Sequence, residues 1–394
     1  MENSNYIWYI LDWIIFVLSS LSVLYLFAFA FASIFHCTHN YDKKNKFSKI
    51  LVLYPAYNEN KVIKESISKF SEQDYPRNSY DIIVISDHMT KETNDWLAQQ
   101  DIILLQPSFP QSSKAKSLKY AMEKADKFKN YEIVIILDAD NIVDSDFLSR
   151  INMVFPKEKA IQAHRTSKNR NTDTAILDSL SEEINNSIFR KGHVNLGISS
   201  ALIGSGEAFN YDWFKANVNK LEISGEDKEL EALLLKDKIF INYLDDVFVY
   251  DEKTQKASGY YKQRRRWLGN QVFCAYKSIK DLPMAIIKWN VGYMDKIIQW
   301  LQPPLILLFG GIFIIAVFIS FLDFSTSIKW WGLWIVFIFT MIMAIPENLW
   351  NKKIIKALLK TPLIFIMMIT NLFRLKGTNK KFIIHTEKDY ENRY

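Results

Sequence analysis

The chain has 394 residues, of which 49% are hydrophobic, and its formal net charge is +6, so its length accommodates two or three domains. The small positive excess lies beside apolar segments, which indicates contact with anionic lipid headgroups, and no basic run interleaved with aromatic residues suggests a nucleic-acid partner. The two cysteines, Cys37 and Cys274, lack metal-ligand spacing and are typical of a reducing compartment without a disulfide framework.

Long apolar segments at both ends predict an integral membrane protein. Between residues 7 and 35 the only charged residue is Asp12, residues 297–322 carry none, and the shorter run 330–346 is also uncharged. Each run is long enough to cross a bilayer. The first run is too long for a cleaved signal peptide and has no basic leader, so we expect it to be an uncleaved anchor.

Lysines predict the orientation of these spans. None precedes the first span, whereas Lys43, Lys44, Lys46 and Lys49 follow it, which places the globular part on the cytoplasmic side of the inner or plasma membrane. By the same rule, residues 361–375 are expected to be re-entrant or interfacial. The predicted parts are an anchor (1–40), a cytoplasmic domain (41–280), interfacial helices with further spans (281–375) and a cytoplasmic tail (376–394).

Strands alternate with helices between the first two spans. Buried-strand patterns cover residues 49–54, 82–85, 102–105, 132–137 and 160–164, and helical patterns cover residues 59–71, 92–99, 114–127, 145–155 and 176–188. A helix that ends near residue 236 precedes a predicted strand pair, 240–243 and 247–250. The alternation indicates crossover connections, a parallel sheet and an α/β fold. Residues 281–300 predict an amphipathic interfacial segment, and Pro303-Pro304 should kink the second span.

Acidic residues follow two of the predicted strands. Asp87 comes after the second strand, and Asp138 and Asp140 come directly after the fourth. Ligands of α/β sheets bind beyond the carboxyl ends of the strands. Two carboxylates separated by Ala139 can face one divalent cation, and oxygen ligands that leave positions for phosphate suit Mg²⁺ or Mn²⁺. A solvated acidic turn is the simpler interpretation of such a pair in isolation.

Two later segments have both a structural and a functional interpretation. Gly204 and Gly206 allow a ligand to approach the backbone, but a plain turn would also need them. Asp227 follows Ser224 by three residues, which fits a helix-capping box.

The basic segment Gln263-Arg264-Arg265-Arg266-Trp267 is ambiguous in the same way. Arginine matches phosphate oxygens and tryptophan stacks on sugar rings, but three consecutive arginines also occur on solvated or lipid-facing helix faces.

In their order, these motifs resemble the membrane-bound family 2 glycosyltransferases, inverting enzymes that include cellulose, chitin and hyaluronan synthases and ceramide glucosyltransferases. The shared order and spacing extend over residues 50–270, and the motifs are P-A-Y-N-E (55–59), Asp87, L-D-A-D-N (137–141), G-S-G (204–206), G-E-D (225–227) and Q-R-R-R-W (263–267). The resemblance implies a GT-A fold with a Rossmann-like, mostly parallel sheet. It also implies a nucleoside-diphosphate sugar donor and a divalent cation.

The resemblance also implies roles for individual residues. Asp87 would hold the donor's uracil or ribose, Asp138 would lie near ribose and metal, and Asp140 would ligate the metal. Asp227 corresponds to the catalytic base, and Gly225 replaces the family's threonine.

Further contacts are expected on both sides of the reacting bond. Gln263 and Arg266, with Lys116, would bind the donor diphosphate. Trp267, Gly206 and Glu226 would contact the acceptor.

The expected activity is transfer of a sugar from a nucleotide-sugar donor, UDP-glucose or UDP-N-acetylglucosamine being the common choices, to a hydroxyl group with formation of a β-linkage. The acceptor would be a lipid, a lipid-linked sugar or a growing glycan in cell-surface polysaccharide or glycolipid synthesis. A processive synthase that secretes its polymer is the alternative within this class, and too few spans for a pore in one subunit would then require a homo-oligomer. A transporter or a silent subunit that senses nucleotide sugars is the alternative outside it.

Overall fold

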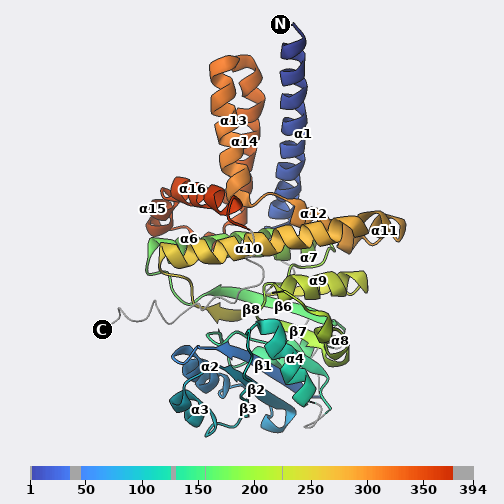
Figure 1. Ribbon diagram of the computed structural model, residues 1–394, viewed down its shortest axis with the longest axis vertical. Coiled ribbons are helices and arrows are strands. Elements are labelled where there is room, and N and C mark those ends of the chain that lie inside the picture. The colour runs from blue at the N-terminus through green and yellow to red at the C-terminus, as the bar shows by residue number, and fades with distance from the viewer. Residues whose placement is uncertain (1, 36–45, 126–129, 156, 224, 376–394) are drawn as a thin grey trace.

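The computed structural model describes residues 2–35, 46–125, 130–155, 157–223 and 225–375. Three long helices, α1 (Glu2–Ser33), α13 (Leu305–Leu322) and α14 (Phe324–Ala344), project together from one end of a domain built on a sheet (Figure 1). These three are apolar and long enough to cross a membrane, and a fourth span would result if the bent pair α15 and α16 crossed as one. The C-terminal tail lies outside the described residues, as do Lys43 and Lys44, two of the four lysines that predicted the orientation.

The sheet has eight strands in the order β3-β2-β1-β4-β7-β6-β8-β5. The pairings β1–β2, β1–β4, β2–β3 and β6–β8 are parallel, whereas β4–β7, β6–β7 and β5–β8 are antiparallel. The strands are β1 (Ile50–Tyr57), β2 (Tyr80–Asp87), β3 (Ile103–Leu105), β4 (Ile133–Ile136), β5 (Ile142–Val143), β6 (Ala160–Ser167), β7 (Glu207–Asn210) and β8 (Ile241–Asp251). The mostly parallel α/β sheet is confirmed, and the sequence reasoning missed the short strands β5 and β7.

The predicted strand pair at 240–250 is wrong, because these residues form the single strand β8. Its pairing with β6 shifts register between Ala163 and His164, so Asp245 and Asp246 form a bulge and not a turn. The bulge is held by basic partners, since Lys191 lies 3.2 Å from Asp245 and Arg150 pairs with Asp246. In this sequence, two polar residues between two apolar runs therefore indicate a bulge within one strand and not a turn between two strands.

Helices cover both faces of the sheet, which explains the uninterrupted apolar strands. Leu51 and Leu53 of β1 pack into one core with α4, α8 and α9, while Ile50 and Val52 pack into the other with α2, α3 and α5. These helices are α2 (Val62–Phe70), α3 (Lys91–Leu97), α4 (Lys114–Ala125), α5 (Phe147–Val154), α8 (Tyr211–Asn217) and α9 (Glu226–Lys236), with the short turns η1 (Arg77–Ser79) and η3 (Val218–Lys220).

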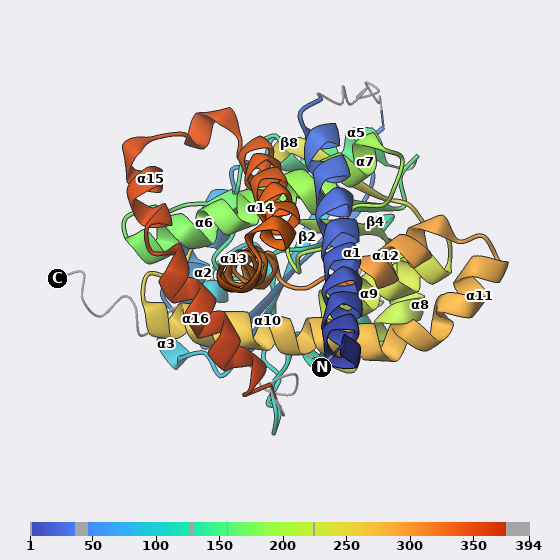
Figure 2. The ribbon, with the colours of Figure 1, turned by 90° about the horizontal axis from the view of Figure 1, so that it is seen from above.

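A layer of helices lies between the sheet and the spanning helices (Figure 1). Seen from above, α13 stands between α6 and α10, while α15 and α16 lie on the opposite side from α11 and α12 (Figure 2). α15 and α16 are bent by 46° relative to each other and lie at the foot of α13 and α14. The layer comprises α6 (Asp173–Asn186), η2 (Ser187–Gly192), α7 (His193–Asn195), α10 (Ala257–Ser278), η4 (Ile279–Asp281), α11 (Leu282–Ile287), α12 (Val291–Leu301), η5 (Glu347–Leu349), α15 (Lys352–Leu358) and α16 (Thr361–Leu372).

Two predicted spans have different bounds in the structure. The apolar run 297–322 is divided, because α12 ends at Leu301 and α13 begins at Leu305, after Pro303 and Pro304. Residues 297–301 therefore belong to the interfacial layer, and the kink expected from the prolines is a complete break. The third span begins at Phe324 and not at residue 330, so it includes a lysine, Lys329.

Lys329 is accommodated within the span by Asp12 of α1. Lys329 forms an ion pair with Asp12, and Trp330 Nε1 donates a hydrogen bond of 2.8 Å to the same carboxylate. The Lys329 ammonium also lies 3.9 Å from the centroid of the Trp13 ring. Both charges thus have partners between α1 and α14, as ionisable residues within a bilayer require.

The lower end of α1 contacts the interfacial layer directly. Tyr25 Oη donates to Asp295 Oδ1 of α12 at 2.9 Å and lies 3.0 Å from His193 Nε2 of α7. The His193 ring stacks on Phe29 with 3.6 Å between centroids. A Cβ atom at Gly192 would lie 2.1 Å from the Phe29 carbonyl oxygen, so only glycine permits this approach. The membrane anchor is therefore packed against the domain.

The Asp12–Lys329 pair should show strong coupling in a double-mutant cycle. Asp12→Leu or Lys329→Met alone leaves one charge without its partner and should lower the free energy of unfolding by about 3 kcal/mol, whereas the double variant should be close to the parent protein. Thermal unfolding in detergent measures this. Removing Lys91 from its exposed pair with Asp95 on α3 is the control and should change little. Additive losses in the double variant would contradict the coupling.

Candidate active site

A cavity of about 1370 Å³ begins at the carboxyl ends of the strands and continues to the spanning helices. Its lower wall contains Asp138 and Asp140 beyond β4 and Asp251 at the end of β8. Its upper wall consists of apolar side chains from α13, α14 and α16, among them Phe309 and Phe365. The cavity is therefore polar near the sheet and apolar near the membrane helices.

Lys114, the first residue of α4, connects three parts of the polar wall. Its ammonium lies 2.5 Å from Asp138 Oδ1, 2.5 Å from the Gly204 carbonyl oxygen and 3.4 Å from Glu226 Oε1. Burial disfavours the charged ammonium, but the carboxylates of Asp138 and Glu226 raise the pKa of Lys114 above its ordinary value. Lys114 therefore stays charged and links the end of β4, the loop that contains Gly204, and α9.

Negative charge is concentrated around Asp140. Burial and repulsion by Asp251 and Asp138 raise the pKa of Asp140 to about 8, although Lys168 opposes this. Asn141 Nδ2 donates to both Asp140 Oδ1 at 3.2 Å and Asp251 Oδ1 at 3.4 Å. Such repulsion between buried carboxylates is relieved by a cation.

The residues present fit a metal that takes part of its coordination from the substrate. Among the described residues, no three acidic, histidine or cysteine side chains are placed to hold a metal ion by themselves. Mg²⁺ is commonly bound by one or two carboxylates together with water and substrate phosphates. Asp140 with Asp138 provides such a set.

Asp227 lies in the cavity wall in the first turn of α9. Helix α9 begins after Gly225, where a Cβ atom would lie 2.7 Å from Asn270 Nδ2, so close packing against α10 accounts for glycine at this position. The capping box expected from Ser224 lies outside the described residues.

Two buried glutamates lie beside Asp227. Burial and repulsion by Asp227 raise the pKa of Glu207 to about 8, and its Oε1 accepts hydrogen bonds from the backbone of Gly204 at 2.6 Å and Ile203 at 3.2 Å. Burial raises the pKa of Glu226 to about 7, with Lys114 opposing and Asp227 adding to the shift. At neutral pH both glutamates hold protons more readily than exposed ones.

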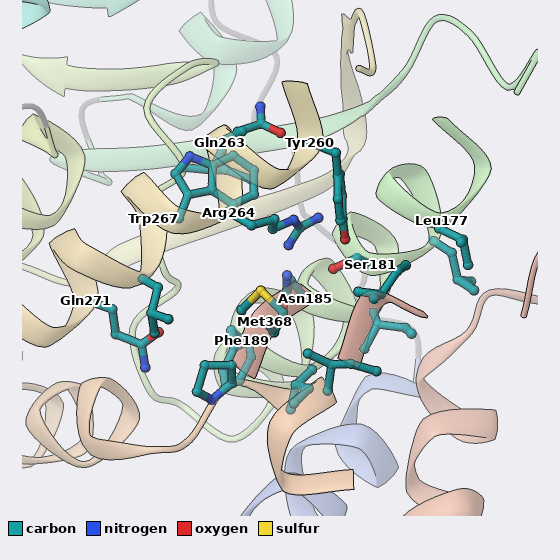
Figure 3. Close-up of a pocket in the computed structure, with 18 of the residues that line it drawn as sticks. Leu177, Ser181, Asn185, Phe189, Tyr260, Gln263, Arg264, Trp267, Gln271 and Met368 are labelled. Carbon is teal, nitrogen blue, oxygen red and sulfur yellow. The ribbon is translucent and has the colours of Figure 1, made fainter. Parts of the chain in front are cut away.

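Helix α10 contributes the side chains above the carboxylates. Gln263, Arg266 and Trp267 all line the cavity. Arg264, to which the sequence reasoning gave no role, donates to Asp178 Oδ1 at 2.7 Å and lies 4.7 Å from the centroids of both Trp267 and Tyr260. Figure 3 shows Arg264 between these aromatic rings, opposite Ser181 and Asn185 of α6. The guanidinium therefore fixes the Trp267 ring at the cavity wall.

Three predicted site residues lie outside the cavity wall: Lys116, Gly206 and Asp87. Lys116 is exposed and donates to the Gln111 carbonyl oxygen at 2.5 Å, because residues two apart on a helix point in different directions and Lys114 faces the cavity. Gly206 is buried, and a Cβ atom there would lie 2.8 Å from Val249 Cγ2. Its φ of +66° and this packing require glycine, whereas Gly204 is the member of the pair that lines the cavity.

Asp87 ends β2, which β1 separates from β4, the strand that precedes Asp138 and Asp140. It pairs in register with Tyr57, which lines the cavity, but Asp87 itself is not part of the wall. Its Oδ1 lies 2.6 Å from His88 Nδ1, and its buried Oδ2 has no hydrogen-bond partner in the described part of the chain. Asp251, which the sequence reasoning missed, follows the same rule as the predicted carboxylates, since it ends a strand.

Three features define a glycosyltransferase with a GT-A fold. They are the mixed sheet, the acidic residues at the strand ends, and helix α10 above them with Arg266 and Trp267. The model of the glycosyltransferase-like family 2 matches residues 48–270, and the chain belongs to that family. The resemblance inferred from the motifs is thereby confirmed.

Individual relatives share less than a third of their residues with the chain. It is 26% identical over 288 residues to the beta-monoglucosyldiacylglycerol synthase of Nostoc sp. strain PCC 7120, which covers 71% of this chain and 60% of the relative. The Trichormus variabilis protein of the same name is 25% identical over the same shares. The chain thus spans about 60% of the length of these relatives. A mannosyltransferase from Pyrobaculum calidifontis, solved with GDP-mannose and Mn²⁺, superposes with a TM-score of 0.49, 17% identity and coverage of 85% of this chain and 99% of that one.

Ionisation of Glu207 should make the folded protein less stable at alkaline pH. Its pKa is about 8 in the folded chain against an ordinary value of 4.5, so its stabilising contribution is complete below pH 4.5 and lost as pH rises through 8. Glu207→Gln keeps the accepting oxygen but cannot ionise. The variant should therefore unfold at a higher temperature than the parent at pH 9, with a flatter dependence on pH between 5 and 9. Equal pH profiles of the two proteins in thermal unfolding would contradict the assignment.

Proposed function

We propose that this glycosyltransferase moves a sugar from a UDP-sugar donor to a hydroxyl group of a lipid at the membrane surface, with inversion and formation of a β-glycosidic bond. The observation that carries the proposal is the continuous cavity, which joins the carboxylates at the strand ends to an apolar region between α13, α14 and α16. A sugar nucleotide fits the polar end, and acyl chains fit the apolar end. The names of the curated relatives, which describe a glucosylated diacylglycerol, agree with a lipid acceptor.

A growing glycan is less compatible with this cavity. Glycan chains need hydroxyl-bonding partners along their path, whereas the upper wall offers mainly aliphatic and aromatic side chains such as Phe313, Ile338 and Leu358. The cavity therefore favours addition of a sugar to a lipid over secretion of a polymer. The domain with this site would face the cytoplasm, as the lysines beside the first span predict.

The donor would lie along the polar wall with its diphosphate between the sheet and α10. Asp140 and Asp138 would hold Mg²⁺ or Mn²⁺, which acts as a Lewis acid toward phosphate oxygens and neutralises charge on the leaving group. Arg266 and Gln263 line the same region of the cavity from α10, where a guanidinium and an amide N–H can donate to phosphate oxygens. Charged and polar donors fixed in this way stabilise the departing diphosphate.

The chemistry would then require one proton transfer. The acceptor oxygen attacks the anomeric carbon from the face opposite the diphosphate while Asp227 takes the hydroxyl proton. A new carbon–oxygen bond forms, the bond to the diphosphate breaks, and the nucleoside diphosphate leaves with the electron pair. Trp267, held by Arg264, offers a flat face for the sugar or acceptor ring.

Asp227→Asn should abolish turnover and spare donor binding. A positioned general base contributes on the order of 10²- to 10⁴-fold, and asparagine keeps the shape without accepting the proton. Transfer of radiolabelled sugar to membrane lipid measures turnover, and calorimetry with UDP measures binding. Asp237→Asn, at the other end of α9 and outside the cavity, is the control and should keep parent activity. Ordinary activity of Asp227→Asn would remove Asp227 from the mechanism.

Asp140→Ala should abolish the Mn²⁺-dependent part of UDP binding, because the variant loses the carboxylate nearest to the proposed cation. Calorimetric titration of UDP with Mn²⁺ and with EDTA measures this dependence. Asp146→Ala and Lys116→Gln alter exposed residues outside the cavity and should bind UDP as the parent does. Metal-dependent binding that survives in Asp140→Ala would contradict the proposed metal site.

A further inference from the structure

The cavity wall contains two basic side chains that have no ion-pair partner among the residues that the structure describes. Arg190 of η2 is only 5% exposed; its Nη1 donates to Asn186 Oδ1 at 2.8 Å, and its Nε has no hydrogen-bond partner among the described residues. Lys228 of α9 follows Asp227 and also lines the cavity. No ion pair or hydrogen bond of its ammonium is present within the described ranges. Lys228 is close enough to Arg190 for electrostatic repulsion between them.

The carboxylates around this basic pair are already neutralised by other cations. Glu182 is bound by Arg165 at 2.7 Å and also forms an ion pair with Lys253. Glu231 lies 2.9 Å from Lys296, and both side chains are almost completely buried. Burial accordingly lowers the pKa of Arg190, which is the behaviour of a buried cation whose charge is not compensated. Asp227 is thus the acidic neighbour that remains for Lys228, and the mechanism uses it as the base.

Polar groups of the interfacial helices complete this part of the wall. Asn270 Oδ1 of α10, Gln299 Nε2 and Trp300 Nε1 of α12, and Gln302 Oε1 are buried and have no hydrogen-bond partner in the described part of the chain, and all four residues line the cavity. Buried polar atoms normally have partners, so such a group indicates a polar ligand. Helices α10 and α12 lie between the sheet and the spanning helices (Figure 1), so in a bilayer these residues would lie near the level of the lipid headgroups.

We propose that Arg190 and Lys228 form a phosphate subsite for the headgroup of the acceptor, which is therefore a phosphate-bearing lipid with a free hydroxyl. This inference rests on the proposed function. Guanidinium and ammonium groups bind phosphate oxygens by charge-assisted hydrogen bonds. A phosphate held at Lys228 places the rest of the headgroup beside Asp227, where a hydroxyl must lose its proton.

The chemistry excludes an uncharged acceptor such as diacylglycerol as the best ligand. A neutral headgroup would leave the buried Arg190 guanidinium without a counterion and would leave Lys228 with Asp227 alone. The donor diphosphate cannot serve as that counterion if Arg266 and the metal at Asp140 bind it. Two classes of lipid carry both a phosphate group and a free hydroxyl. One is a glycerophospholipid with a hydroxylated headgroup, and the other is a polyprenyl-diphosphate-linked sugar.

The test uses the full-length protein in phosphatidylcholine nanodiscs doped with one of three lipids: diacylglycerol, phosphatidylglycerol or polyprenyl-diphosphate-linked N-acetylglucosamine. Transfer from radiolabelled UDP-glucose and UDP-N-acetylglucosamine is measured for each lipid, and lipid retention is measured by native mass spectrometry. The parent should transfer sugar to one phosphate-bearing lipid at least tenfold faster than to diacylglycerol and should retain that lipid selectively.

Variants separate the subsite from the donor site. Lys228→Gln and Arg190→Gln should lose at least tenfold in transfer to the phosphate-bearing lipid and in its retention, while UDP affinity in calorimetry stays unchanged. Arg190→Lys keeps the charge and should recover part of the loss, which distinguishes the subsite from a folding defect. Lys262→Gln, on the exposed face of α10, is the matched control and should behave as the parent.

Two results would overturn the subsite. The first is that the parent transfers sugar to diacylglycerol as fast as or faster than to the phosphate-bearing lipids, and that Lys228→Gln and Arg190→Gln keep this activity. The second is that both variants lose affinity for UDP, which would assign both cations to the donor site. Failure of the proposed function has a different signature, since the parent would then neither hydrolyse nor transfer from any donor, even though it retains the phosphate-bearing lipid.

Discussion

The active-site region depends on the Lys114 ammonium, which neutralises acidic groups that the fold brings together. Asp138 comes from β4, Glu226 from α9, and the Gly204 carbonyl oxygen from the loop before β7, and all three contact this cation. Without it, these groups would repel one another next to Asp140 and Glu207, whose pKa values are already raised. The same ion pairs hold α9 in place, so Lys114 also determines where Asp227 lies relative to the strand ends.

Buried charges also attach the sheet domain to the apolar helices. Tyr25 of α1 contacts Asp295 and His193, and the next residue of α12, Lys296, pairs with Glu231 of α9. Glu231 lies four residues after Asp227 and therefore on the same side of α9. A continuous set of contacts thus connects the anchor, the interfacial layer and the helix that carries the proposed base. This arrangement fixes the site relative to the apolar helices, which the proposed transfer to a lipid would require.

Much of the fold and part of the site could be predicted from local patterns. Apolar runs indicated β1 to β4, and the residues that ended them located Asp138 and Asp140, because a strand buried on both faces needs apolar residues throughout and polar ones only at its ends. Short strands such as β5 and β7 carry too few residues for a pattern. The sequence also could not show which of Lys114 and Lys116 belongs to the site. Both lie in the first turn of α4, and only the position of Asp138 in the fold shows that Lys114 faces the cavity.

The sequence by itself determined the class of protein, the order of the motifs, the strand ends and the existence of apolar spans, because each of these depends on neighbouring residues or on fixed spacing. The tertiary structure decided which charges meet. Asp12 and Lys329 are 317 positions apart, yet their pairing explains how a lysine is accommodated within a span. It also showed that Arg190 and Lys228 face one cavity while the nearby Glu182 and Glu231 bind other cations. Charge compensation in a folded protein depends on distances between remote segments, and local patterns hold no information about those distances.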